Sequence, residues 1–276
     1  MNPHQQHPAS ILEIARSFWR NRSLIWQMTR RDVVGRYRGS IVGMAWSFFN
    51  PVLMLVVYTF VFSVVFKTRW GTGVSESKTD FAVILFVGMM VHGLFAECVN
   101  RAPGLILSNV NYVKKVVFPL ETLPIVAMGS TLFHFLVSLA VLLLAFSLLV
   151  DYPHWTVLLL PIVLLPLIVG TLGIAWVLAS LGVFARDIGQ ITGVITTVMM
   201  FLAPVFYPIS ALPPEYQAIL LINPLSFIIE QARVVLIWGG TPDWVGLGIY
   251  SLPSVAVMWV GYWWFQKTRK GFADVL

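Results

Sequence analysis

The sequence predicts an all-helical integral membrane protein with six transmembrane helices, and three observations support this prediction. Of its 276 residues, 58% are hydrophobic and only 11% are charged, with a mean hydropathy of +0.82. A soluble domain with a packed core would not use that mixture. Apolar stretches of about 20 residues, each long enough to cross roughly 30 Å of hydrocarbon, recur along the chain. The basic residues are distributed very unevenly between those stretches.

The chain is predicted to consist of a cytoplasmic segment, residues 1–40, followed by a transmembrane domain, residues 41–276. The spans are expected at about 41–66, 81–99, 123–150, 157–185, 188–207 and 245–265. We expect no cleavable secretory signal, because the first forty residues are polar and rich in arginine. The single cysteine, Cys98, excludes an intrachain disulfide, and we expect it to be a small packing residue.

The cytoplasmic segment contains an amphipathic pattern, because apolar residues recur at helical spacing between Ile11 and Trp19. Ser10 and Glu13 fit a capping box at the start of that helix. We expect the helix to lie in the cytoplasmic membrane interface, either as a simple anchor or as part of a site that recruits an anionic lipid-linked substrate. Arginine suits such a substrate, because its planar guanidinium binds phosphate oxygens through two nitrogens. The arginines predicted to help recruit that substrate are Arg31, Arg36 and Arg38.

The loop charges predict the orientation of the bundle, since Lys and Arg near the ends of spans are retained in the cytoplasm. With six spans, fourteen of the eighteen basic residues fall on the side that holds both termini. Both termini are therefore expected to be cytoplasmic. The net charge of +6 then serves as an orientation signal, and no nucleic-acid partner is expected.

The count of six depends on the stretch from Tyr216 to Trp238, which is apolar and long but is broken at Asn223-Pro224. Pro224 lacks a backbone donor and disfavours helix at Asn223. We therefore predict a re-entrant helical hairpin within residues 213–238, made of two half-helices that enter the membrane and return. Glu230 and Arg233 lie three residues apart and are expected to pair.

Two further regions bear on energy supply. Residues 101–118 are too polar for lipid and too apolar for a solvated linker, so we expect a short helix there that packs either on a partner subunit or on the protein's own loops. The closest approach to a phosphate-binding loop, residues 72–79, lacks the glycines whose amides would hold phosphates. If ATP drives this protein, the ATPase must therefore be another polypeptide.

Several groups of residues, in a fixed order, carry a family resemblance. They are Arg36–Trp46 leading to Asn50-Pro51, Asn111–Pro119 with Pro124 following, Arg186-Asp187, Ala203–Pro208, Asn223-Pro224 with Glu230–Arg233, and Gly271–Leu276. Together they resemble the type 2 ABC-exporter permeases of bacterial polysaccharide export, over nearly the whole chain. The permeases for lipid-linked O-antigen are the most similar, followed by those for capsular polysaccharide and teichoic acid.

The resemblance implies a function and a set of partners. The chain would be a multi-pass permease of the bacterial inner membrane that exports undecaprenyl-diphosphate-linked polysaccharide, O-antigen first, and would itself carry out no enzymatic step. It would work as a homodimer with two copies of an ABC nucleotide-binding subunit, which would hold ATP and Mg, so this chain would need no cofactor and no metal.

The resemblance also implies roles for particular residues. Contact with the ATPase, through a coupling helix, would involve Leu105, Ile106, Asn109, Asn111, Tyr112, Lys114 and Lys115. The half-helices would form an external gate that includes Tyr216, Asn223, Pro224, Glu230 and Arg233.

A long polysaccharide needs a wet tunnel, in which aromatic rings stack on sugar faces and polar groups bind hydroxyls. The candidate lining residues, from the first and fifth spans, are Trp46, Phe49, Tyr58, Thr192, Thr196, Phe201 and Tyr207. Each aromatic could instead face lipid or a neighbouring helix. His92, Glu97 and Asn100 of the second span are costly in lipid and should form hydrogen bonds between helices.

Two alternatives to polysaccharide export stay open. An exporter of lipids or small drugs would need a lateral cleft more than an aromatic tunnel. A membrane enzyme acting on polyprenyl phosphates would cluster acidic residues around a divalent metal in a cytoplasmic loop. Only the isolated acids Asp32, Glu121 and Asp187 occur there, which disfavours the enzyme.

Overall fold

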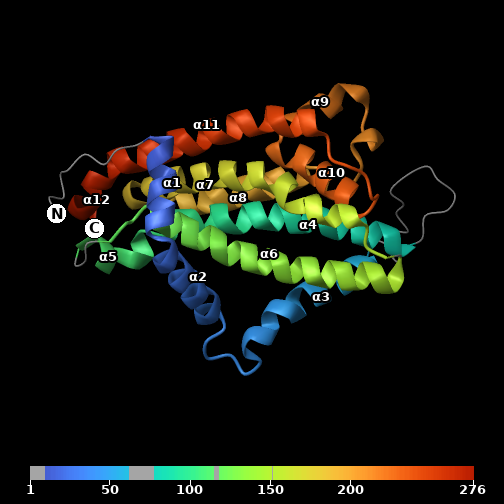
Figure 1. Cartoon of the computed structure of the whole chain (residues 1–276), viewed down its shortest axis with the longest axis horizontal. Coiled ribbons are helices and arrows are strands. Elements are labelled where there is room, and N and C mark those ends of the chain that lie inside the picture. Colours follow the sequence, from blue (N-terminus) through green and yellow to red (C-terminus); the bar gives the residue numbers. More distant parts are fainter. Residues whose placement is uncertain (1–9, 62–77, 115–117, 151) are drawn as a thin grey trace.

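The computed structural model describes residues 10–61, 78–114, 118–150 and 152–276, and within these ranges it contains helices and turns but no β-strand. The prediction of an all-helical protein is therefore confirmed for the part of the chain that is described. The α-helices are α1 (Ile11–Arg20), α2 (Arg22–Arg36), α3 (Trp46–Tyr58), α4 (Lys78–Arg101), α5 (Val110–Lys114), α6 (Thr122–Leu149), α7 (Leu160–Phe184), α8 (Ile188–Phe201), α9 (Pro214–Ile222), α10 (Pro224–Leu236), α11 (Trp244–Thr268) and α12 (Phe272–Val275). The long helices α4, α6, α7 and α11 run along one common direction (Figure 1).

Five helical stretches among the described residues are long and apolar enough to cross a membrane. They are Gly43–Val61, Phe81–Gly104, Thr122–Leu149, Trp155–Phe184 and Trp244–Val275, and they match the predicted first, second, third, fourth and sixth spans. The predicted fifth span, 188–207, contains only α8, whose 14 residues measure about 21 Å. α8 ends there because Pro204 disfavours helix in the residue before it. The count of six thus stays a prediction. Residues 62–66, at the end of the predicted first span, lie outside the described residues. So do residues 72–77 of the loop that was considered as a phosphate-binding loop.

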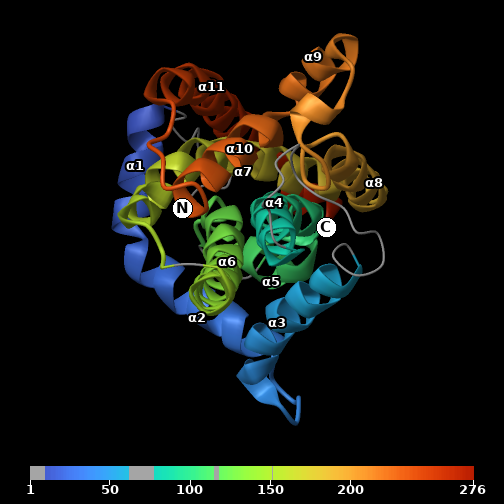
Figure 2. The same ribbon diagram turned by 90° about the vertical axis from the view of Figure 1, so that its right-hand side faces the viewer.

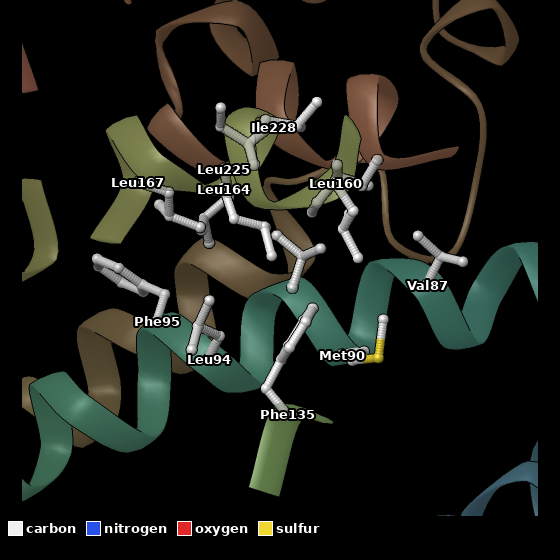
Figure 3. Packing of buried hydrophobic residues seen from close by; sticks show 14 of the residues in the cluster. Val87, Met90, Leu94, Phe95, Phe135, Leu160, Leu164, Leu167, Leu225 and Ile228 are labelled. Carbon is white, nitrogen blue, oxygen red and sulfur yellow. The ribbon is translucent and has the colours of Figure 1, made fainter. Parts of the chain in front are cut away.

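α4 is the central helix of the bundle. In the end-on view of Figure 2 it is surrounded by α6, α7, α8 and α10, and it contacts each of them. Side chains from α4, α6, α7 and α10 interdigitate in one apolar cluster (Figure 3). Each helix contributes a buried residue to that cluster, namely Leu94, Phe135, Leu164 and Ile228. Of the apolar stretch in α4, 83% is buried, whereas only 11% of the stretch that includes α3 is buried. α3 therefore exposes a long apolar surface that the other described residues do not cover.

The N-terminal helix α1 begins as the sequence predicts, because the Ser10 hydroxyl accepts a hydrogen bond from the backbone amide of Glu13 at 3.2 Å. The helix docks on the bundle through Ser17, which is buried, and Ile14, which is partly buried. Phe18 and Trp19 remain exposed. An outward apolar side suits a helix that rests on lipid, and the interface location stays a prediction.

The predicted break at Asn223 is confirmed. α9 ends at Ile222, α10 begins at Pro224, and the Asn223 side chain caps α10 by accepting from the backbone amide of Leu225 at 3.0 Å. The two helices have 9 and 13 residues, about 14 and 20 Å, so neither is long enough to cross a membrane alone. Their re-entry into a membrane stays a prediction.

α7 and α11 pack very closely along their length because glycines meet where they cross. A Cβ atom at Gly173 would overlap the backbone at Val257 and Met258, and one at Gly261 would overlap the backbone of Gly173. Small residues at such crossings let two membrane helices approach and gain dispersion energy.

Candidate functional site

Two ion pairs join α2 to the end of α4. Nη2 of Arg101 donates to both carboxylate oxygens of Asp32, at 2.9 and 2.7 Å. One helical turn along each helix, Nη2 of Arg36 donates to Oε1 of Glu97 at 2.6 Å. Each helix contributes one acid and one base spaced four residues apart, so the ladder forms in one register only.

His134 of α6 extends this ladder. Its Nδ1 atom lies 3.0 Å from Nη1 of Arg36 and 3.2 Å from Oε1 of Glu97, and the tautomer decides which of the two it bonds. Its Nε2 atom is buried and has no hydrogen-bond partner among the described residues. Tyr37 packs edge-on against the imidazole, with ring centroids 6.1 Å apart. Burial raises the pKa of the Tyr37 hydroxyl, an effect that Arg36 partly offsets, so the phenol is neutral at physiological pH.

A cavity of about 340 Å³ runs along α3 and ends at these charges. Its walls come from α3, α4 and α6, with Tyr58 and Phe86 toward one end and Glu97 and His134 at the other. A second cavity of similar size adjoins the same charges and includes Trp46 and Arg36. Aromatic and polar groups therefore face the same spaces, as a sugar chain would require.

The three predicted diphosphate-binding arginines do not form one group. Arg36 is engaged with Glu97 and His134, as described above. Arg31 and Arg38 are exposed and line a cavity of about 550 Å³ outside α2. Arg31 also lines a cavity of about 490 Å³ between α2, α4, α6 and the segment that follows α4, together with Arg36 and Arg101.

The predicted tunnel residues fall into two groups. Trp46, Phe49 and Phe201 are exposed, and Tyr58 lines the cavity along α3. Thr192 and Thr196 are buried instead and bond within the protein.

Thr192 donates to the carbonyl of Gly189 at 2.9 Å, and the Thr196 hydroxyl lies 3.1 Å from both the Asn100 Oδ1 atom and the Gly193 carbonyl. His92 lies 2.9 Å from the carbonyl oxygen of Thr196. The interhelical hydrogen bonds predicted for His92, Glu97 and Asn100 are thus confirmed.

Tyr207 lies beyond the end of α8. Its hydroxyl donates to the carbonyl of Phe201 at 2.6 Å. This bond ties the Tyr207 side chain to the end of α8. The exposed ring of Phe201 stacks on Phe206, with centroids 5.7 Å apart.

The segment 102–118 contains the 3-10 turns η3 (Ala102–Gly104) and η4 (Leu107–Asn109) and the five-residue α5, rather than one continuous helix. Ile106 is fully buried, and Leu105 and Tyr112 pack against the same apolar cluster. Asn109 donates to the carbonyl of Leu105 at 2.8 Å.

The remaining predicted contact residues of this segment point outward or lie beyond the description. The exposed members are Asn111 and Lys114, whereas Lys115 is outside the described residues. A Cβ atom at Gly182 of α7 would overlap the carbonyl of Pro103, so η3 lies directly on that helix.

Glu121 ties both termini to this end of the bundle. Its carboxylate accepts from Ser17 of α1 at 3.1 Å and from Arg269, beyond α11, at 2.8 Å. Its carbonyl accepts from the Trp176 indole at 3.0 Å. Phe272 of α12 is buried in the same apolar cluster as Ile106, so α1, α5 and α12 lie together at one end (Figure 1).

Arg233 anchors the hairpin at the opposite end of α4. It is fully buried and donates to the carbonyls of Ile84 and Val205, both at 3.2 Å. It also pairs with Glu230 at 2.8 Å, which confirms the predicted pair. Asn223 donates to the carbonyl of Met199 at 2.8 Å, and the hydroxyl of Tyr250 donates to the carbonyl of Pro224 at 2.9 Å. Tyr216, on α9, is exposed.

Sequence reasoning treated Asp32 and Glu121 as isolated acids and did not single out His134. The i,i+4 spacing of Asp32 with Arg36, and of Glu97 with Arg101, was the available signal for the ladder. Among the described residues, no group of three His, Cys, Asp or Glu side chains could hold a metal ion. Cys98 is buried in the main core, as expected of a packing residue.

Comparison with known proteins finds relatives of this chain over most of its length. Its apolar helices make it a multi-pass membrane protein. The O-antigen export system permease protein RfbA of Myxococcus xanthus is 28% identical over 266 residues, covering 96% of this chain and 99% of that protein. A protein of the same name from Klebsiella pneumoniae is 24% identical, covering 92% of this chain and 95% of that protein. The polysialic acid transport protein KpsM of Escherichia coli is 21% identical, covering 84% and 88%.

The sequence profile of a family described as ABC-2 type transporter matches residues 23–237, from α2 to the end of α10. That match includes the charge ladder, the segment 102–118 and the hairpin at Asn223. Because it covers more than half of the chain, this protein belongs to the ABC-2 type transporter family.

Proposed function

We propose that this chain is the permease subunit of an ATP-driven exporter that moves an undecaprenyl-diphosphate-linked polysaccharide across the bacterial inner membrane. The polymer is O-antigen in this proposal. The observation that carries it is the nearly end-to-end similarity to the O-antigen export permease of Myxococcus xanthus. Capsular polysaccharide is the second candidate, because the polysialic acid transporter matches with lower identity over a smaller part of the chain.

The structure supports the proposal through the spaces around α3. The cavity along α3 combines a mixed aromatic and aliphatic wall with a charged end, which suits a chain of hydroxylated rings. α3 also exposes Phe49, Leu53 and Val56, and it lies within the stretch Gly43–Val61, which is long enough to cross a membrane. A second copy of this chain, facing α3, would cover that surface and close the cavity into a tunnel, so the proposed unit is a homodimer.

Two copies of an ABC nucleotide-binding subunit supply the energy in this scheme. They bind ATP and Mg and press on the segment 102–118, where Asn111 and Lys114 are exposed. Gly182 transmits that displacement to α7, since it leaves no gap between α7 and η3. The hairpin α9–α10 then opens and closes the outer mouth. This chain alternates between conformations and carries out no covalent chemistry.

Deletion of this gene, followed by analysis of lipid-linked polymers on each membrane leaflet, tests the proposal. We expect lipid-linked polymer to accumulate inside and surface polysaccharide to be lost, and expression of the gene from a plasmid should restore both. Loss of capsule with intact O-antigen would move the assignment to the second candidate. Normal surface polysaccharide of both kinds would overturn the proposal.

A further inference from the structure

The cavity of about 490 Å³ beside α2 has an excess of positive charge. Three guanidinium groups line it, from Arg31, Arg36 and Arg101, but Asp32 is the one carboxylate among its lining residues. Glu97 neutralises Arg36 from outside the cavity, and Asp32 neutralises Arg101. The charge of Arg31 remains as the excess.

Arg101 also keeps an unused donor. Both oxygens of Asp32 bond to its Nη2 atom, whereas its Nη1 atom is buried and makes no hydrogen bond within the described ranges. Oε1 of Glu97 lies 3.8 Å from this Nη1 atom, which is beyond hydrogen-bond distance. Nη1 is shielded from solvent in this conformation, so an anion in the cavity would reach it only after the guanidinium turns toward the cavity. A buried donor on a charged group is costly to leave unpaired, which favours that turn.

Neutral polar groups and apolar side chains make up the rest of the lining, the apolar ones being Met28, Leu105, Leu123, Val126 and Ala127. Asn109 and Tyr112 come from the segment 102–118, and Gly35 lies between the arginines of α2. The volume falls within the range of small-molecule pockets. Guanidinium groups beside a phenol and an amide suit an anion with several acceptor oxygens, which is the chemistry of phosphate.

We propose that this cavity binds the phosphate or diphosphate group of a lipid-linked substrate, with Arg31 and Arg101 as its principal ligands. The proposal rests on the proposed function, which supplies a lipid diphosphate, although free phosphate offers the same oxygens. The lipid source is favoured because Arg31 also borders the outer cavity, which contains the apolar side chains of Val34 and Met44.

This site differs from the arginine group predicted from sequence. Arg36 is committed to Glu97 and His134, and Arg38 lines only the outer cavity. Arg101 takes their place. Because Tyr112 lines the cavity, a bound headgroup would touch the segment 102–118, which the ATPase is proposed to move. Substrate binding and ATP-driven motion would therefore involve the same segment.

The first test uses the full chain with its ATPase subunit in nanodiscs of neutral lipid. Binding of inorganic pyrophosphate and of farnesyl diphosphate is measured by calorimetry for Arg31→Gln and for the matched control Arg30→Gln. Arg30 is exposed on the same helix and lines neither cavity beside α2. We expect Arg31→Gln to weaken binding of both probes about tenfold, because one charge-assisted contact is lost. Arg30→Gln should change it less than about twofold, since an exposed charge that does not line the cavity is screened by solvent.

A second variant tests the location without changing any charge. A Cβ atom at Gly35 meets nothing within 4 Å, and Gly35 lines both cavities beside α2, so Gly35→Leu should fold and narrow the space next to Arg31. We expect it to weaken pyrophosphate binding about tenfold or more. Gly189→Leu, at an equally open helical position on α8, serves as its control and should bind normally.

Each outcome bears on the proposal. Equal losses in Arg31→Gln and Arg30→Gln would indicate diffuse surface attraction and would overturn it, as would normal binding in Gly35→Leu. Farnesyl diphosphate binding no tighter than pyrophosphate would overturn the lipid source. The absence of pyrophosphate binding would overturn this site alone, whereas the deletion phenotype decides the proposed function separately.

Discussion

Arginines hold the two ends of α4 in opposite ways. Near Ile84, Arg233 is fully buried, and two of its hydrogen bonds go to backbone carbonyls. At the other end, 39% of the Arg36 side chain and 26% of the Arg101 side chain are exposed, and their acidic partners are side-chain carboxylates. A backbone carbonyl cannot turn away without deforming its segment, whereas a carboxylate can rotate toward water. The Arg233 end is therefore a fixed anchor, and the Arg101 end can exchange partners.

The surroundings of the two ends fit this difference. Three cavities adjoin the charges at the Arg101 end. At the Arg233 end, a Cβ atom at Gly88 would already lie 2.9 Å from the Arg233 guanidinium and 3.2 Å from the Val205 backbone. A side chain at position 88 would therefore press against the Arg233 guanidinium and the Val205 backbone. A transporter needs both a part that stays fixed and a part that responds to substrate, and α4 connects the two.

The largest expected effect comes from breaking the anchor. Arg233→Met keeps an unbranched side chain as far as about the Nε position but leaves Glu230 and two buried carbonyls without their donor. We expect the free energy of unfolding in mild detergent to fall by about 3–5 kcal/mol, as is typical when one partner of a buried pair is removed. Titration with a denaturing detergent, followed by far-UV circular dichroism, measures it.

Glu230→Gln is the control for that variant. Glu230 is 28% exposed, and the amide oxygen of glutamine can still accept from Arg233. We expect a loss below about 1 kcal/mol, in the range of partly exposed pairs. Equal losses in the two variants would mean that Arg233 is held by its charge partner rather than by the backbone, and the contrast between the ends of α4 would disappear.

An intermediate effect is expected for the pair of Asp32 and Arg101. A double-mutant cycle with Asp32→Asn and Arg101→Gln isolates their coupling energy. We expect roughly 1 kcal/mol, because about 32% of the Asp32 side chain and 26% of the Arg101 side chain meet solvent. The coupling should shrink at high salt, since exposed charges are screened. A coupling energy above about 3 kcal/mol that does not change with salt concentration would mean that this end of α4 is a second fixed anchor.

The sequence predicted local features of this protein better than distant contacts. The break at Asn223, the Ser10 cap and the pair of Glu230 with Arg233 depend on residues within three positions of each other. Proline chemistry, capping chemistry and helical spacing determine those features directly. The ladder joins residues 61 and 69 positions apart, and no periodicity reports which helices become neighbours.

The faces of α8 show the same limit. Thr192 and Thr196 looked suited to a wet tunnel, because threonine is polar and the span is apolar. In the structure their hydroxyls return to carbonyls of their own helix, and Thr196 also bonds to Asn100 of α4. A threonine in a membrane helix can bond its hydroxyl to the backbone of its own helix in this way, so the presence of threonine does not indicate a polar surface.

The smallest expected effect separates Arg36 from Arg38. Arg36 uses two nitrogens on two partners, since Nη2 donates to Glu97 while Nη1 lies 3.0 Å from His134. The single ammonium of lysine in Arg36→Lys can keep only one of these contacts well, so we expect a loss of about 0.5–1 kcal/mol in unfolding free energy. Arg38→Lys should change it by less than about 0.3 kcal/mol, because Arg38 is exposed and lysine keeps its charge. If the two variants proved equal, Glu97 would need only a nearby positive charge, and the Arg101 end of α4 would be looser than its hydrogen bonds indicate. A measurable difference would show that Glu97 and His134 hold Arg36 in a defined geometry. A site that responds to substrate needs such a defined starting arrangement.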